Sequence, residues 1–167
     1  MPDISNKPTL TSDDKVNVNR SAIEHRATWM GLIYEAAKKA GADAEAILRE
    51  AVSRTGCLHG AALSERITGP LTVKAFAEAF LNPLGAGTFE MEVTENTRDA
   101  LAIRFHYCPL VAGWEKAGIP AGHIPTLCDI AMDGDRAIAG TVGVGFELGH
   151  TIAGGEPVCE LRFFRKD

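Results

Sequence analysis

The sequence predicts an α+β fold, in which a helical N-terminal half is followed by a mostly antiparallel β-sheet with a helical insertion between two hairpins. The main observation is the spacing of apolar residues, which changes from helical to alternating after Gly85-Ala86-Gly87. The pair Gly154-Gly155 suits the tight turn of a second hairpin. No repeat or low-complexity tract interrupts this order, so one layered domain is expected.

The N-terminal half is expected to begin with a flexible arm. Residues 1–20 are mostly polar and have little to bury, whereas residues 21–167 are expected to form the single domain. Ser21 and Glu24 form a capping box, which predicts the start of the first helix. Apolar residues then recur at helical spacing until Gly41, which can end the helix in a left-handed conformation.

Further helices are predicted before the pattern changes. Asp43 and Thr72 can each cap a helix N-terminus with a side-chain oxygen. The apolar residues behind each cap recur at helical spacing, and these helices are expected to end near Gly56 and at Pro83. The N-terminal half of the domain is therefore expected to be helical.

The C-terminal half is expected to contain the hairpins and the insertion. Residues 89–94 and 101–108 alternate apolar with polar side chains around a turn, which predicts a hairpin with one apolar face. Glu90 and Glu92 are expected on its solvated face. The remaining elements are expected to be helices at residues 110–116 and 125–139, with a break at residues 133–135 left open, and strands at residues 142–151 and 157–165.

Composition indicates one globular domain and argues against some classes of partner. Lys and Arg number 17 against 22 Asp and Glu, and this net charge of −5, without a basic run, argues against a nucleic-acid partner. No apolar run approaches the roughly 18 residues of a membrane span, and the polar start lacks a signal peptide. We therefore expect a cytoplasmic protein, in which the 4 cysteines are reduced.

Cys108 is the leading candidate for a catalytic residue. It ends a predicted strand beside Pro109, where a side chain can face a pocket, and His106 is expected on the same side. An imidazole, with Arg104 on the same face, can hold a thiol partly as the nucleophilic thiolate. The alternative is that His106 and Cys108 are simply packed against a helix.

Two other cysteines lie downstream, Cys128 in the helical insertion and Cys159 in the last strand. No two cysteines form a Cys-x-x-Cys hook, so no metal ligands and no cofactor are predicted. A zinc ion stays open as an alternative, since three thiolates with His106 would suit its tetrahedral preference. Ordinary burial is the other explanation for each cysteine, Cys57 included.

Two aspartates in the insertion are also candidates. Asp129 follows Cys128 inside an apolar helical stretch, where a buried carboxylate must find partners. It is expected to orient His106 or to bind a substrate amine or amidine. Asp135 follows a glycine and is expected either to cap a helix or to contribute to substrate binding.

A longer pattern links these positions. Its segments are His106-Tyr107-Cys108-Pro109-Leu110-Val111-Ala112-Gly113-Trp114, Leu127-Cys128-Asp129, Gly134-Asp135, Thr151-Ile152-Ala153-Gly154-Gly155 and Cys159-Glu160-Leu161-Arg162-Phe163. The ordered set resembles the family named for 2-amino-thiazoline-4-carboxylate hydrolase, the bacterial enzyme that opens a thiazoline ring on the way to cysteine. The resemblance lies largely within residues 105–164. Leu161 stands where an aromatic residue is more usual in the final motif.

The resemblance implies a hydrolase that opens a small cyclic amidine, imide or thiazoline-type ring at a carbon–nitrogen bond other than a peptide bond. Cys108 would attack the ring carbon, His106 would transfer the proton and Asp129 would orient the N–H edge of the substrate. Arg104 would hold a substrate carboxylate through paired hydrogen bonds. The other two downstream cysteines would line the pocket or ligate a metal that supplies hydroxide.

A second class of function stays open from the residues. The cysteines could instead belong to a sensory module that binds a small molecule or a metal without turnover. A small-molecule ligand is expected in either case. The polar arm and the exposed strand edges also predict a homo-oligomer.

Overall fold

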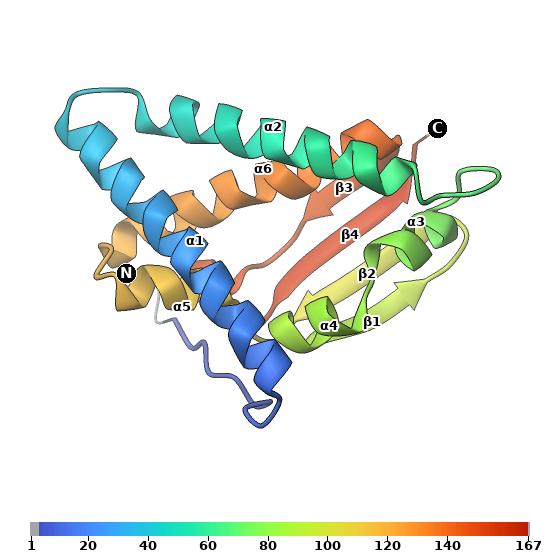
Figure 1. Ribbon diagram of the computed structural model, residues 1–167, viewed down its shortest axis with the longest axis horizontal. Coiled ribbons are helices and arrows are strands. Elements are labelled where there is room, and N and C mark those ends of the chain that lie inside the picture. Colours follow the sequence, from blue (N-terminus) through green and yellow to red (C-terminus); the bar gives the residue numbers. More distant parts are fainter. Residues whose placement is uncertain (1–3, 167) are drawn as a thin grey trace.

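A computed structural model describes residues 4–166 and confirms the α+β fold (Figure 1). The helices are α1 (Asp14–Lys39), α2 (Ala44–Ser64), α3 (Val73–Phe80), α4 (Pro83–Phe89), α5 (Pro109–Lys116) and α6 (Ile124–Val142), with the short 3₁₀ turns η1 (Ala121–His123) and η2 (Ile152–Gly154). The strands are β1 (Met91–Asn96), β2 (Ala100–Phe105), β3 (Val144–Leu148) and β4 (Cys159–Arg165). None of the described helices is long and apolar enough to cross a membrane.

The strands form one antiparallel sheet in the order β1-β2-β4-β3, so the C-terminal strand lies inside the sheet. The insertion of α5 and α6 separates the β1–β2 hairpin from the β3–β4 pair, as predicted (Figure 1). The β2–β4 register places Phe105 opposite Cys159 and Arg104 opposite Glu160. Because side chains alternate between faces, the first pair belongs to the buried face and the second to the solvent face.

Helix packing depends on close approach at glycines. Gly113 of α5 lies against α1, where an added Cβ would come within 2.6 Å of the Glu24 carbonyl oxygen. Gly56 of α2 lies against α6, where an added Cβ would collide with the carbonyl oxygen of Gly134. The prediction that α2 ends near Gly56 is therefore wrong, because this glycine serves packing inside a helix that continues to Ser64.

The predicted start of the first helix at Ser21 is also wrong. α1 begins at Asp14, because the Asp13 carboxylate accepts hydrogen bonds from the backbone N–H groups of Lys15 (2.9 Å) and Val16 (3.1 Å). Residues 14–20 of the predicted arm are thus helical, whereas residues 1–3 lie outside the described part of the chain. The earlier start is stabilised by burial of the Val16 side chain.

The glycine-rich stretch before the sheet is helical. Asn82 caps α4 by accepting a 2.8 Å hydrogen bond from the Gly85 N–H, so the predicted strand at residue 89 begins instead at Met91. Glu90 lies between α4 and β1 with a φ of 49°, which corrects its expected place on a strand face. α6 runs without a break through residues 133–135.

Candidate functional site

The structure brings the three downstream cysteines together from separate elements. Cys108 precedes α5, Cys128 lies in the second turn of α6, and Cys159 begins β4. Each of these cysteines carries a free thiol and is only 6–7% exposed. Cys159 raises the pKa of both other thiols and Cys108 raises that of Cys128, which places the sulfurs within electrostatic range of one another. These cysteines therefore form one buried cluster.

The thiols of this cluster are protonated in the free protein. Burial and, after it, the neighbouring Cys159 raise the pKa of Cys108, and the backbone N–H groups of Val111 and Leu110 lower it, with a net value of about 12. Burial likewise raises the pKa values of Cys128 and Cys159. The structure therefore does not support a resting thiolate at Cys108, because its desolvation outweighs the favourable N–H groups.

His106 is not paired with Cys108. The strand ends at Phe105, so the alternation that would align the two side chains stops before it reaches them. The His106 imidazole is 45% exposed, and its Nε2 lies 2.9 Å from Glu92 Oε2 of β1. Within residues 4–166 no hydrogen bond joins the imidazole to the thiol of Cys108. The structure thus places His106 on the solvent face of the sheet.

Arg104 also faces away from the thiols. Its Nε donates a 3.1 Å hydrogen bond to Glu160 Oε1 across the β2–β4 pair, and both side chains are well exposed. This is the solvent face of the sheet, opposite to the face of Cys159. The arrangement is that of a cross-strand ion pair rather than a substrate clamp.

Asp129 lies in an ion-pair network rather than in an apolar interior. One carboxylate oxygen accepts a 2.7 Å hydrogen bond from Arg49 of α2, and the other accepts a 2.6 Å bond from Arg136. Asp133 bonds the same arginines at 2.9 and 2.6 Å. Partial burial raises the pKa of Asp129, but the two arginines outweigh it and lower the pKa overall. Asp129 therefore ties α2 to α6.

Asp135 has no hydrogen-bond partner in another described residue, and Arg26, which lowers its pKa, also lowers that of Cys108. Asp135 does not cap a helix, because it lies inside α6, seven residues after Cys128 and on the same face. Burial raises the pKa of this carboxyl to about 6, although Arg26 and Arg136 lower it. An uncompensated carboxylate in such surroundings is costly, which marks Asp135 as a candidate functional group.

Arg26 of α1 is the group that sequence analysis missed. Its guanidinium is exposed and has no hydrogen bond or ion pair with any residue in the described range 4–166, yet it lowers the pKa of both Asp135 and Cys108. It therefore lies near both. The only signal in the sequence was its position on α1 between Ile23 and Met30, which pack against the core. That position does not distinguish a binding arginine from a structural one.

The segment that contains η2 forms hydrogen bonds with two cysteines of the cluster. The Ile152 N–H donates to Cys159 Sγ at 3.3 Å, and the Thr151 side chain forms a hydrogen bond that lowers the pKa of Cys128. The Thr151 hydroxyl also accepts a 3.1 Å bond from the Gly154 N–H. This geometry explains why the motif Thr-Ile-Ala-Gly-Gly accompanies the cysteines in the sequence.

Metal ligands are not gathered in the described part of the chain. Within residues 4–166 no group of three or more His, Cys, Asp or Glu side chains has an arrangement that could hold a metal ion. The cysteine cluster is thus close enough for electrostatic coupling but does not form a ready ligand set.

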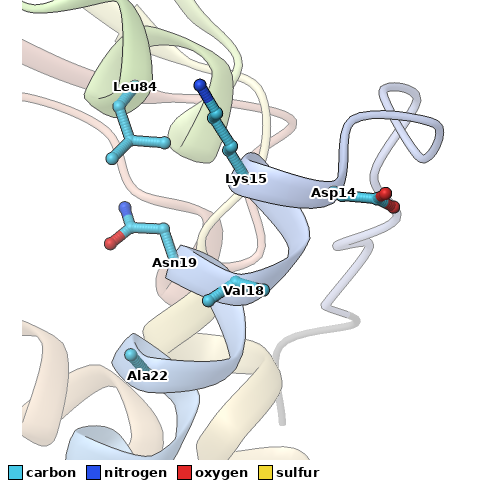
Figure 2. Close-up of a pocket in the computed structure, with 6 residues that line it drawn as sticks. All are labelled: Asp14, Lys15, Val18, Asn19, Ala22 and Leu84. Atoms are coloured by element: carbon cyan, nitrogen blue, oxygen red, sulfur yellow. The ribbon is translucent and has the colours of Figure 1, made fainter.

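Two surface hollows lie apart from this cluster. One lies between α1 and α4 (Figure 2) and is lined by Asp14, Lys15, Val18, Asn19, Ala22 and Leu84. The other is lined by residues 66–68 and by residues of and just after α3. Neither includes a cysteine, Arg26 or Asp135. We assign no chemistry to them, because neither pairs a nucleophile with a base.

A thiol, a guanidinium and a carboxyl without partners are groups that an enzyme site can use as nucleophile, anion-binding group and base. The family model for L-2-amino-thiazoline-4-carboxylic acid hydrolase matches residues 20–163. The chain belongs to this family, and the resemblance in its sequence is confirmed. No curated protein and no solved structure gives a significant match to it.

Proposed function

We propose that this protein hydrolyses a small cyclic substrate of the thiazoline-carboxylate type at a carbon–nitrogen bond other than a peptide bond. The family supports a hydrolase with a small-molecule substrate. The observation that carries the proposal for the site is the cysteine cluster (Cys108, Cys128 and Cys159) together with the unpaired Arg26, whose charge acts on both Cys108 and Asp135.

The charges of the site match those of such a substrate. The Arg26 guanidinium can donate two parallel hydrogen bonds to a ring carboxylate. The Asp135 carboxylate can accept a hydrogen bond from the N–H edge of a ring amidine. Neither side chain is paired with another described residue, so a substrate that carries both groups would replace water rather than break an existing ion pair.

Cys108 is the proposed nucleophile, and Asp135 takes the role that the sequence suggested for His106. The Cys108 sulfur forms a bond to the ring carbon, while its proton passes to Asp135 and then to the ring nitrogen as the carbon–nitrogen bond breaks. The oxygen of a water molecule then forms a bond to the same carbon, the bond between this carbon and the Cys108 sulfur breaks, and one proton of the water passes through Asp135 to that sulfur, which restores the thiol. A carboxyl with a pKa of about 6 is largely ionised at neutral pH and can accept the proton.

The N-terminus of α5 stabilises negative charge on the Cys108 sulfur. The N–H groups of Val111 and Leu110 favour an anionic sulfur, and Arg26 has the same effect. These groups act against the burial that keeps the thiol protonated in the free protein. The proposal therefore requires deprotonation to accompany attack on the bound substrate rather than to precede binding.

Substitution of Cys108 tests the nucleophile. We expect Cys108→Ser to lower kcat by on the order of 10³-fold or more, because a serine hydroxyl is a far weaker nucleophile without a strong base. The substrates are 2-amino-thiazoline-4-carboxylate and its analogue without the carboxylate, with product followed by chromatography. An unchanged rate for the variant would show that Cys108 does not attack the ring.

Substitution of Arg26 tests the carboxylate site. Arg26→Gln should raise KM for the carboxylate substrate by about tenfold to a hundredfold, which is the effect of losing a charged hydrogen-bond pair. The same variant should leave KM for the analogue without a carboxylate nearly unchanged. Arg54→Gln is the matched control. The Arg54 side chain is 80% exposed, and within the described residues its ion pair is with Glu50. Equal effects on both substrates would contradict the assignment.

The raised thiol pKa values also favour the second candidate, a module that binds a small molecule or a metal without turnover. Buried thiols are poor nucleophiles but can contact a ligand. Stoichiometric zinc in untagged protein, together with no turnover of either thiazoline, would favour this candidate. Turnover that depends on Cys108 would exclude it.

A further inference from the structure

The segment between residues 5 and 10, here called the N-terminal strap, contacts the site at Cys108. The Asn6 side-chain amide forms two hydrogen bonds with the Cys108 backbone. Its Nδ2 donates to the Cys108 carbonyl oxygen at 2.9 Å, and its Oδ1 accepts from the Cys108 N–H at 2.9 Å. The side chain of Asn6 thus pairs with Cys108 as a neighbouring strand would.

This pairing occurs where the backbone has left regular structure. Cys108 follows the end of β2 and precedes the first residue of α5, Pro109, so its N–H has no partner in a strand or a helix. A buried backbone N–H without a partner is unfavourable, because it has lost its hydrogen bond to water. Asn6 supplies that partner, which holds the Cys108 backbone at the helix N-terminus.

The other end of the strap is held by Glu90. One of its carboxylate oxygens accepts hydrogen bonds from the N–H groups of Thr9 (2.7 Å) and Leu10 (2.8 Å), and the other accepts from the Thr9 hydroxyl (2.7 Å). The buried Arg20 donates to Glu90 at 3.0 Å, and its guanidinium lies over the Tyr107 ring, 4.6 Å from the ring centre.

We infer that Asn6 is a positioning residue, which through these two hydrogen bonds fixes the backbone of Cys108 and so the place of its thiol in the cysteine cluster. The Arg20–Glu90 pair orients the strap that carries Asn6. The catalytic meaning of this role rests on the proposed function. The structural role does not rest on the proposed function, because the accessibility of the Cys108 thiol can be measured by its labelling rate without any substrate.

Thiol labelling measures this role directly. The experiment uses the full chain with Cys57→Ser, which removes the exposed thiol and leaves the buried cluster. A buried thiol reacts with 5,5′-dithiobis(2-nitrobenzoate) only through local opening. We expect Asn6→Ala to raise the labelling rate of Cys108, assigned by peptide mass spectrometry, by about tenfold, the size of one or two lost hydrogen bonds. Lys7→Ala, at an exposed neighbouring position in the strap, is the control and should change nothing.

Activity then distinguishes positioning from general stability. Asn6→Ala should lower kcat by about tenfold with KM changed less than about threefold, because the substrate contacts of Arg26 and Asp135 remain. Asn6→Asp keeps the acceptor for the Cys108 N–H but loses the donor, so an intermediate labelling rate is expected. This second variant also serves if Asn6→Ala fails to fold.

The outcomes separate this inference from the proposed function. A Cys108 labelling rate within twofold of the parent in both Asn6 variants overturns the positioning role. Equal acceleration at Cys128 and Cys159 also overturns it, because the effect would then be global. Faster labelling of Cys108 with unchanged kcat supports the role of Asn6 but contradicts Cys108 as the nucleophile.

Discussion

Asp135→Asn should make the protein more stable at neutral pH while impairing its proposed chemistry. Burial raises the pKa of this carboxyl from its ordinary value of 3.8 to about 6. The folded state therefore holds a proton more tightly than the unfolded state, and ionisation at pH 7 opposes folding. The pKa difference corresponds to about 3 kcal/mol, which an uncharged amide of the same shape would recover.

The sign of the effect fixes its pH window. Ionisation of Asp135 destabilises the fold increasingly as the pH rises above 3.8, and the effect is complete above pH 6. The advantage of Asp135→Asn should thus be full at pH 7 and absent below about pH 4. Urea unfolding can be monitored by circular dichroism. At pH 7 the urea midpoint of Asp135→Asn should be about 1.5 M higher than that of the parent protein, if the free energy of unfolding falls by about 2 kcal/mol per M urea.

Asp133→Asn provides the contrast on the same helix. Asp133 bonds Arg49 and Arg136, so its substitution should lower the free energy of unfolding at pH 7 by about 1–3 kcal/mol. If Asp135→Asn is instead neutral or destabilising at pH 7, the carboxylate has partners that this structure does not show, and its role as a free base fails.

Three further predictions follow from the placement of other residues. His106→Ala should keep kcat/KM within about twofold, because the imidazole lies on the solvent face with Glu92, and a loss above tenfold would contradict that placement. Gly56→Ala should lower the free energy of unfolding by about 1–3 kcal/mol, because the added Cβ collides with the carbonyl oxygen of Gly134. Gly122→Ala is the control, since an added Cβ there meets open space and should leave this free energy unchanged. Calorimetry of both variants checks this. The homo-oligomer stays a prediction, supported by the edge strands β1 and β3, and a monomeric mass in light scattering would refute it.

Helix caps that depend only on neighbouring residues could be predicted from the sequence. Asp43 and Thr72 cap α2 and α3 as expected, since a cap needs only a side-chain oxygen and the N–H groups two or three residues ahead. The start of α1 was wrong for a related reason. Both Asp13 and Ser21 are competent caps, and burial of the Val16 side chain, which depends on distant residues, favours the first.

The expected side-chain contacts of Asp129 and His106 were wrong, because they depended on partners that are not local in the sequence. Asp129 was expected to be a buried catalytic carboxylate, but Arg49, which is remote in the sequence, neutralises it on the surface of α6. The pairing of His106 with Cys108 extended a strand pattern beyond the end of β2. Arg26 was missed because a cation on a helix shows its role only when its neighbours are known.

The order of helices and strands, the caps of α2 and α3 and the set of cysteine motifs could be predicted from the sequence, since periodicity and short-range hydrogen bonding act over a few residues. Which charged groups have an ion-pair partner and which have none could be learned only from the tertiary structure. Ion pairing and desolvation depend on distances between segments far apart in the chain. For this reason the charge of Arg26 acts on Cys108, whereas Arg104 pairs with Glu160 and His106 with Glu92.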